Sequence, residues 1–136
     1  MTYLVEGNVL CETTKASPNG RVVEWLSANE GRLLVDPIIL GEMPIGILAF
    51  PAGRKRSQLQ DWFSALARTI ECLPWDAAVS KRWAELVVAL RNKGRRLPLL
   101  DSMITATALE YRLTLVTRNT RDFKQTGVKL VDPFAS

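Results

Sequence analysis

Residues 3–10, YLVEGNVL, place a carboxylate directly after a short apolar run and follow it with glycine and asparagine. The run predicts a short strand over residues 2–6 that is apolar enough to be buried on both faces, as in a parallel sheet. Ligands bind outside the carboxyl ends of the strands in such sheets. Glu6 is therefore either a metal ligand or only a charge that ends the strand.

The rest of the chain alternates strand and helix signals. Apolar segments predict further strands at residues 33–35, 69–73, 113–117 and 128–131. Helical spacing and start signals predict five helices. One begins at the pair Ser17-Pro18, one has Pro44 in its first turn, and three begin at Arg54, Asp76 and Leu97. This alternation predicts one α/β domain over residues 1–136, with a mainly parallel sheet of about five strands and helices on both faces.

Composition limits the kinds of protein and of chemistry. Hydrophobic residues make up 47% and charged residues 24% of 136 positions, as in ordinary globular domains. No apolar run approaches the roughly 20 residues of a membrane helix, and no signal-peptide pattern precedes the first strand, so we expect a cytoplasmic protein. The sequence contains no histidine, which excludes mechanisms that depend on imidazole.

Acidic and amide side chains follow several predicted strands or begin the helices between them. They are Glu6, Glu42, Asp101, Asn119 and Asp122. An open parallel sheet would bring these positions to one edge. Together they suggest an oxygen-ligand site for a hard divalent ion such as Mg²⁺ or Mn²⁺. The net charge of +4 is compatible with a polyanionic partner.

Four segments carry a resemblance that spans nearly the whole chain. YLVEGNVLCE resembles YLLDTNVLSE, the typical opening of VapC-type toxins of the PIN-domain family, and IILGEMPIGI resembles their ITLGELRRGI. PLLDSMITATAL and LTLVTRNTRDFKQTGVKLVDPF are similar to the family's later segments, in the same order and at the same spacing.

The resemblance implies a three-layer α/β/α PIN fold and an endoribonuclease that depends on Mg²⁺ or Mn²⁺. It implies the toxin of a toxin–antitoxin pair, homodimeric, held inactive by a cognate antitoxin and linked to operator DNA only through that antitoxin. Carried over by position, the metal-binding and catalytic acids are Glu6, Glu42, Asp101 and Asp122, with Asn119 as a further catalytic residue. Arg118 and Arg121 would contact the RNA.

The first motif departs from the family pattern. Glu6 stands where aspartate is usual, Gly7 where threonine or serine is usual, and Asp36 where serine is usual. One interpretation is a re-tuned site in which Gly7 makes room for the longer Glu6 and Asp36 supplies a further ligand. The other is a catalytically impaired PIN module retained for antitoxin binding and co-repression.

Two alternatives to an active nuclease, an impaired PIN module and a phosphoacceptor receiver domain, each require further sequence features. An impaired module would keep an apolar groove for its partner, and Trp25, Trp62 and Leu66 are the candidates for its lining. A phosphoacceptor receiver domain would share the parallel sheet and acidic pocket. It would need adjacent acids after the first strand and a lysine after a late one, whereas this chain has Glu6-Gly7 and Thr117-Arg118.

Overall fold

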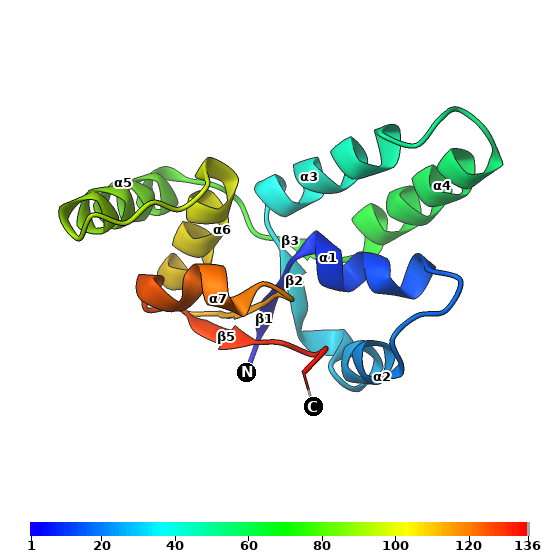
Figure 1. Cartoon of the computed structure of the whole chain (residues 1–136), viewed down its shortest axis with the longest axis horizontal. Coiled ribbons are helices and arrows are strands. Elements are labelled where there is room, and N and C mark those ends of the chain that lie inside the picture. Colours follow the sequence, from blue (N-terminus) through cyan, green and yellow to red (C-terminus); the bar gives the residue numbers. More distant parts are fainter. Residues whose placement is uncertain (136) are drawn as a thin grey trace.

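The computed structural model describes residues 1–135 and contains one five-stranded sheet at the centre of the molecule (Figure 1). Its strands are β1 (Tyr3–Val5), β2 (Leu33–Val35), β3 (Glu71–Cys72), β4 (Thr114–Val116) and β5 (Lys129–Val131). The strand order is β3-β2-β1-β4-β5, and every pairing is parallel. The predicted parallel sheet of about five strands is confirmed.

Helices connect and cover these strands. The α-helices are α1 (Gly7–Leu10), α2 (Gly20–Ala28), α3 (Pro37–Leu48), α4 (Arg54–Thr69), α5 (Ala77–Asn92), α6 (Leu99–Glu110) and α7 (Thr120–Phe123). Short 3-10 turns are η1 (Cys11–Thr14), η2 (Glu30–Arg32) and η3 (Lys124–Thr126). The pairs α3/α4 and α5/α6 extend to opposite sides of the sheet in Figure 1. Among residues 1–135, no helix has both the length and the apolar character required to cross a membrane.

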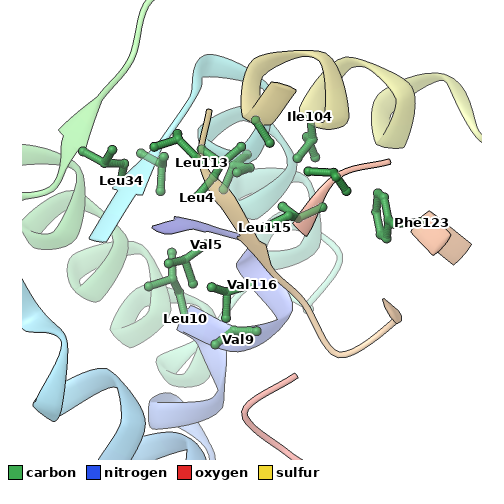
Figure 2. Packing of buried hydrophobic residues seen from close by; sticks show 14 of the residues in the cluster. Leu4, Val5, Val9, Leu10, Leu34, Ile104, Leu113, Leu115, Val116 and Phe123 are labelled. Carbon is green, nitrogen blue, oxygen red and sulfur yellow. The ribbon is translucent and has the colours of Figure 1, made fainter. Parts of the chain in front are cut away.

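The core explains why the first strand reads as a continuous apolar run. Leu4 pairs in register with Leu34 and Leu115, and both Leu4 and Val5 are fully buried. Figure 2 shows Leu4 on one side of the sheet and Val5 on the other side. Because both faces are covered, neighbouring side chains of β1 are apolar instead of alternating with polar ones.

Two helix starts differ from the sequence-based expectation. Helix α2 begins after Asn19, whose side chain accepts hydrogen bonds from the backbone N–H groups of Arg21 and Val22, at 2.9 and 3.3 Å. Ser17-Pro18 carries the same type of start signal, but those residues lie outside the helix. The Asn19 carboxamide caps the helix instead, which is a role that asparagine fills as well as serine.

The prediction that Pro44 begins a helix is wrong. Helix α3 begins seven residues earlier at Pro37, and Asp36 caps it by accepting a hydrogen bond of 2.9 Å from the Ile39 N–H. Proline is favoured at the first helical position, and Pro37 occupies it. Pro44 then lies inside the helix, where it has no N–H to donate to the preceding turn.

The strand order places a crevice at the carboxyl end of β1. From β1 the chain continues to β2 on one side of it, and later returns to β4 on its other side. In parallel α/β sheets this reversal of direction is where ligands bind. Glu6 directly follows β1 and Thr117 directly follows β4, so both residues lie at this point.

Candidate active site

Glu6 is buried at the end of β1 and makes hydrogen bonds through its backbone and its side chain. Its backbone N–H donates to the carbonyl of Val116 at 3.0 Å, which continues the ladder between β1 and β4. Its carboxylate Oε2 accepts hydrogen bonds from the Thr117 hydroxyl at 2.7 Å and from the Asn8 carboxamide at 3.2 Å. The residue is only 8% exposed. The carboxylate is therefore oriented by neighbours from both strand ends.

Glu6 lines a cleft of about 660 Å³, which we call the acidic cleft. The polar lining of the acidic cleft includes Glu6 and Asn8 after β1, Glu42 on α3, Lys55 on α4, Asp101 on α6 and Asn119 after β4. Its apolar lining comes largely from α3, α4 and the connection between them, and includes Met43, Ile47, Phe50, Leu59 and Trp62. The cleft thus joins a group of carboxylates to a mostly apolar wall.

Burial and mutual repulsion raise the pKa values of the carboxylates that line the acidic cleft. Burial raises the pKa of Glu6 from its ordinary value of 4.5 to about 7; the Thr117 hydrogen bond opposes this rise, and the charges of Asp101 and Glu42 add to it. Burial and the charge of Asp101 raise the pKa of Glu42. A cluster of like charges resists ionisation until a cation or a proton compensates it.

The sequence-predicted site residues fall into two groups. Glu6, Glu42, Asp101 and Asn119 come together in the acidic cleft. Asp122, in α7, is exposed and does not line the cleft, although its charge contributes to the raised pKa of Asp101 after the larger effect of burial. Asp122 therefore lies at the margin of the site.

The cleft fits a divalent cation in the type of its donors. Glu6, Asp101, Glu42 and Asn119 offer carboxylate and amide oxygens, the ligands that Mg²⁺ and Mn²⁺ prefer. Among residues 1–135, however, no three acidic or cysteine side chains are close enough to form a ready-made metal site. Mg²⁺ is usually held by one or two carboxylates and keeps several waters. The arrangement fits that mode of binding, and it does not fit a cage of four protein ligands.

The amino-acid sequence matches the profile of a known domain. The sequence profile of the PIN domain matches residues 3–129, which is nearly the whole chain. The chain belongs to the PIN domain family.

Known proteins and solved structures are similar to this PIN domain over nearly its full length. It is 29% identical to the VapC ribonuclease Y4jK of Sinorhizobium fredii, over 96% of each chain. Its fold matches the structure of FitAB bound to an IR36 DNA fragment, with a TM-score of 0.91, 26% identity and coverage of 99% and 97% of the two chains. It also matches a toxin–antitoxin complex from Klebsiella pneumoniae, with a TM-score of 0.74, 26% identity and coverage of 99% and 100%.

Sequence reasoning missed three residues that shape the site of this PIN domain. Thr117 and Asn8 bind the Glu6 carboxylate, and Lys55 brings a positive charge to the cleft. Thr117 is the last residue of the predicted LTLVT segment and directly follows β4, and Asn8 is two residues beyond Glu6. Both positions were therefore visible as polar groups at strand ends, whereas Lys55 reaches the cleft only through the packing of α4 against α3.

Asp36, proposed from the sequence as a further ligand, does not line the acidic cleft. It is fully buried, and its Oδ1 accepts the α3 cap bond while its Oδ2 accepts a hydrogen bond of 2.7 Å from the Thr107 hydroxyl. Because α3 carries Glu42 and α6 carries both Thr107 and Asp101, Asp36 ties together two helices that bear site carboxylates. Its role is to position them.

The apolar groove expected from three side chains is only partly present. Trp62 lines the acidic cleft. Trp25 instead packs edge-to-face against Tyr3, with ring centroids 4.9 Å apart, and Leu66 packs against the core without lining the cleft. Tertiary packing, which the helical spacing of these residues did not reveal, decided which of them faces the cleft.

Proposed function

We propose that this PIN domain is a ribonuclease of the VapC type and the toxin of a toxin–antitoxin pair. The observation that carries the proposal is the convergence of Glu6, Glu42 and Asp101 in one cleft at the switch point of the sheet. The relative named VapC ribonuclease, which this chain matches over 96% of its length, supports the same assignment.

Glu6 and Asp101 would hold a divalent cation, Mg²⁺ or Mn²⁺, in this active site. When bound, such an ion neutralises charge on a phosphodiester and makes water easier to deprotonate. Thr117 and Asn8 fix the orientation of the Glu6 carboxylate, in the way that supporting hydrogen bonds orient metal ligands. Glu42 and Asn119 line the same cleft, where the Glu42 carboxylate would accept a hydrogen bond from water and the Asn119 amide would donate one to a phosphate oxygen.

Basic side chains attract the RNA to this acidic site. Lys55 lines the acidic cleft, and Arg118 and Arg121 follow β4 on the exposed surface. The guanidinium of Arg118 lies 4.5 Å from the centroid of the Phe134 ring, a cation–π contact that limits its motion. These charges contact RNA phosphates on either side of the carboxylates.

A cognate antitoxin protein is the proposed regulatory partner, with operator DNA reached only through it. The FitAB structure on DNA and the Klebsiella pneumoniae toxin–antitoxin complex support this proposal, since both share the fold over nearly the full chain. The apolar part of the acidic cleft, around Phe50, Leu59 and Trp62, offers the surface for such a partner. A homodimer is the proposed state of the toxin itself.

RNA cleavage by the purified protein tests the proposal. We expect cleavage of total bacterial RNA in the presence of Mn²⁺, and a loss of at least about 10²-fold in Asp101→Asn. Asp61→Asn is the matched control, because Asp61 is an exposed acid on α4 that does not line the cleft. Equal cleavage by Asp101→Asn and wild type would refute the assignment of the acidic cleft as the active site. No cleavage by wild type at any Mn²⁺ concentration would refute the ribonuclease assignment.

A further inference from the structure

We propose that a second cavity, between α5 and α6, binds a nucleotide of the substrate RNA close to the cleaved bond; this inference rests on the proposed ribonuclease function. The cavity has a volume of about 510 Å³, within the range of about 300–1,000 Å³ typical of small-ligand sites. Its lining includes Arg91, Arg95 and Arg96 together with Trp83, Val87 and Leu99. We call it the arginine pocket.

The arginine pocket shares a wall with the acidic cleft. Leu99 and Ser102, in the first turn of α6, line the arginine pocket, whereas Asp101 in the same turn lines the acidic cleft. Residues in a helix are about 100° apart around the axis, so Leu99 and Asp101 face nearly opposite directions. The two sites are then separated by about one helix diameter, roughly 10 Å, which a single RNA strand crosses within a few nucleotides.

The charge of the arginine pocket suits a phosphate. The ion pairs found within residues 1–135 are Lys15–Glu12 and Arg82–Glu110, so none of the three pocket arginines has an acidic partner in that part of the chain. All three arginines are exposed. A guanidinium offers a planar pair of N–H donors that matches two oxygens of a phosphate.

Stabilisation of the helix end does not account for this cluster. Arg91 lies in the last turn of α5, where the helix dipole favours a cation. Arg95 and Arg96 lie beyond the helix, which ends at Asn92. Gly94, with a positive φ of 68°, turns the chain, and the Arg95 N–H donates to the carbonyl of Leu90 at 2.8 Å. The turn thereby brings the later arginines back beside Arg91.

The apolar wall of the arginine pocket suits a base. The indole N–H of Trp83 donates to the Ser102 hydroxyl at 2.9 Å, and that hydroxyl donates to the carbonyl of Leu99 at 2.6 Å. These bonds fix the Trp83 ring, while Leu99 on the rim is 62% exposed. Arginines beside an aromatic and apolar surface are the combination that proteins use for single-stranded RNA.

Binding of RNA without metal tests the pocket separately from catalysis. The probe is a fluorescein-labelled RNA of twelve nucleotides and mixed sequence, measured by anisotropy in EDTA with the full chain. For the double variant Arg95→Ala/Arg96→Ala we expect about tenfold weaker binding and a salt slope smaller by about 1.4, because each lost contact to single-stranded RNA removes about 0.7. The double variant Arg95→Lys/Arg96→Lys should keep most of the slope. Arg68→Ala is the matched control, because Arg68 is the exposed basic residue in the last turn of α4.

The possible outcomes distinguish a failure of the arginine-pocket inference from a failure of the proposed ribonuclease function. Normal binding and salt slope in the double alanine variant, with RNA cleavage by wild type intact, would overturn the pocket and leave the proposed function standing. If the wild-type protein neither binds nor cleaves RNA, both the arginine pocket and the proposed ribonuclease function are overturned. A second copy of the chain is the alternative occupant of the arginine pocket, and light scattering tests for it by measuring the oligomeric state. If the variant loses RNA affinity only because its oligomeric state changes, the pocket is an interface between copies and the inference fails.

Discussion

Gly7 and Met43 are in such close contact that a Cβ atom built on Gly7 would lie 2.9 Å from Cγ of Met43. Met43, on α3, is only 4% exposed, and both residues line the acidic cleft. The space next to Gly7 is therefore filled by a methionine from another helix. Glycine at this position makes room for Met43. That it also makes room for the longer side chain of Glu6 stays a prediction.

This contact predicts that Gly7→Ala destabilises the protein. A distance of 2.9 Å forces Met43 to shift within a packed site, and overpacking of this kind costs about 1–3 kcal/mol. The gain in helix propensity at the start of α1 offsets less than about 1 kcal/mol. We expect a net loss of about 1 kcal/mol in the free energy of unfolding, measured by urea denaturation.

Gly20→Ala is the control for this prediction. Gly20 is also the first residue of a helix, and a Cβ atom there would meet nothing within 4 Å. We expect no loss of stability. A loss at Gly20 equal to that at Gly7 would show that the contact with Met43 is not the cause.

The hydrogen bond from Thr107 to Asp36 predicts the effect of Thr107→Val. This near-isosteric change leaves Oδ2 of a fully buried carboxylate without its 2.7 Å partner. An unsatisfied buried acceptor costs about 1–3 kcal/mol, and we expect a loss of that size in urea denaturation. Thr69→Val, at an exposed threonine in α4, should cost much less. A Thr107→Val protein as stable as wild type would contradict the positioning role of Asp36.

The raised pKa of Glu6 predicts that stability falls as pH rises from about 4.5 to 7. In this interval the native carboxyl still holds a proton that the unfolded chain has lost. The unfolded state then binds fewer protons, so the free energy of unfolding decreases with increasing pH. Each pH unit corresponds to about 1.4 kcal/mol, which sets an upper limit of about 3.5 kcal/mol for Glu6 alone.

Glu6→Gln should remove most of this pH dependence and make the metal-free protein more stable than wild type at pH 8. Urea denaturation at intervals between pH 4.5 and 8 measures it. Glu24→Gln, at an exposed glutamate of α2, is the control and should follow the wild-type profile. A pH profile of Glu6→Gln identical to that of wild type would contradict the assignment.

Mn²⁺ should raise the unfolding temperature at pH 8 and have a smaller effect at pH 5.5. The carboxylates must be ionised to bind a cation, and burial raises the pKa of Glu6, Glu42 and Asp101 alike. At a Mn²⁺ concentration about 100-fold above Kd, binding adds about 2.7 kcal/mol to the free energy of unfolding. Thermal denaturation with and without EDTA measures this effect.

Asp101→Asn should lose most of the stabilisation by Mn²⁺, whereas Asp61→Asn should retain it. The reversion Glu6→Asp tests the first motif, and calorimetry compares its Mn²⁺ affinity with that of wild type. Binding by the reversion but not by wild type would mean that the longer carboxylate has disabled the site. An equal response of Asp101→Asn and wild type would place the cation elsewhere.

Much of the fold could be predicted because its signals are local. The apolar runs around Leu4 and Leu115 are short and bury both faces, and strand–helix alternation then favours a parallel sheet. Two helix starts were misplaced because several nearby residues carry equivalent start signals. Asn19 and Asp36 act as caps, and only the geometry of the folded chain distinguishes them from Ser17 or from a start at Pro44.

The residue types along the chain define the available groups: oxygen donors without histidine, placed after segments that predict parallel strands. They predict an oxygen-ligand chemistry and the edge of the sheet at which Glu6, Glu42, Asp101 and Asn119 come together. Tertiary structure alone decided which acids share the cleft, with Glu6 and Asp101 inside, Asp122 at the margin and Asp36 buried in a structural role. The reason is physical: a carboxylate's role depends on its solvation and its hydrogen-bond partners, and for these residues both come from segments distant along the chain.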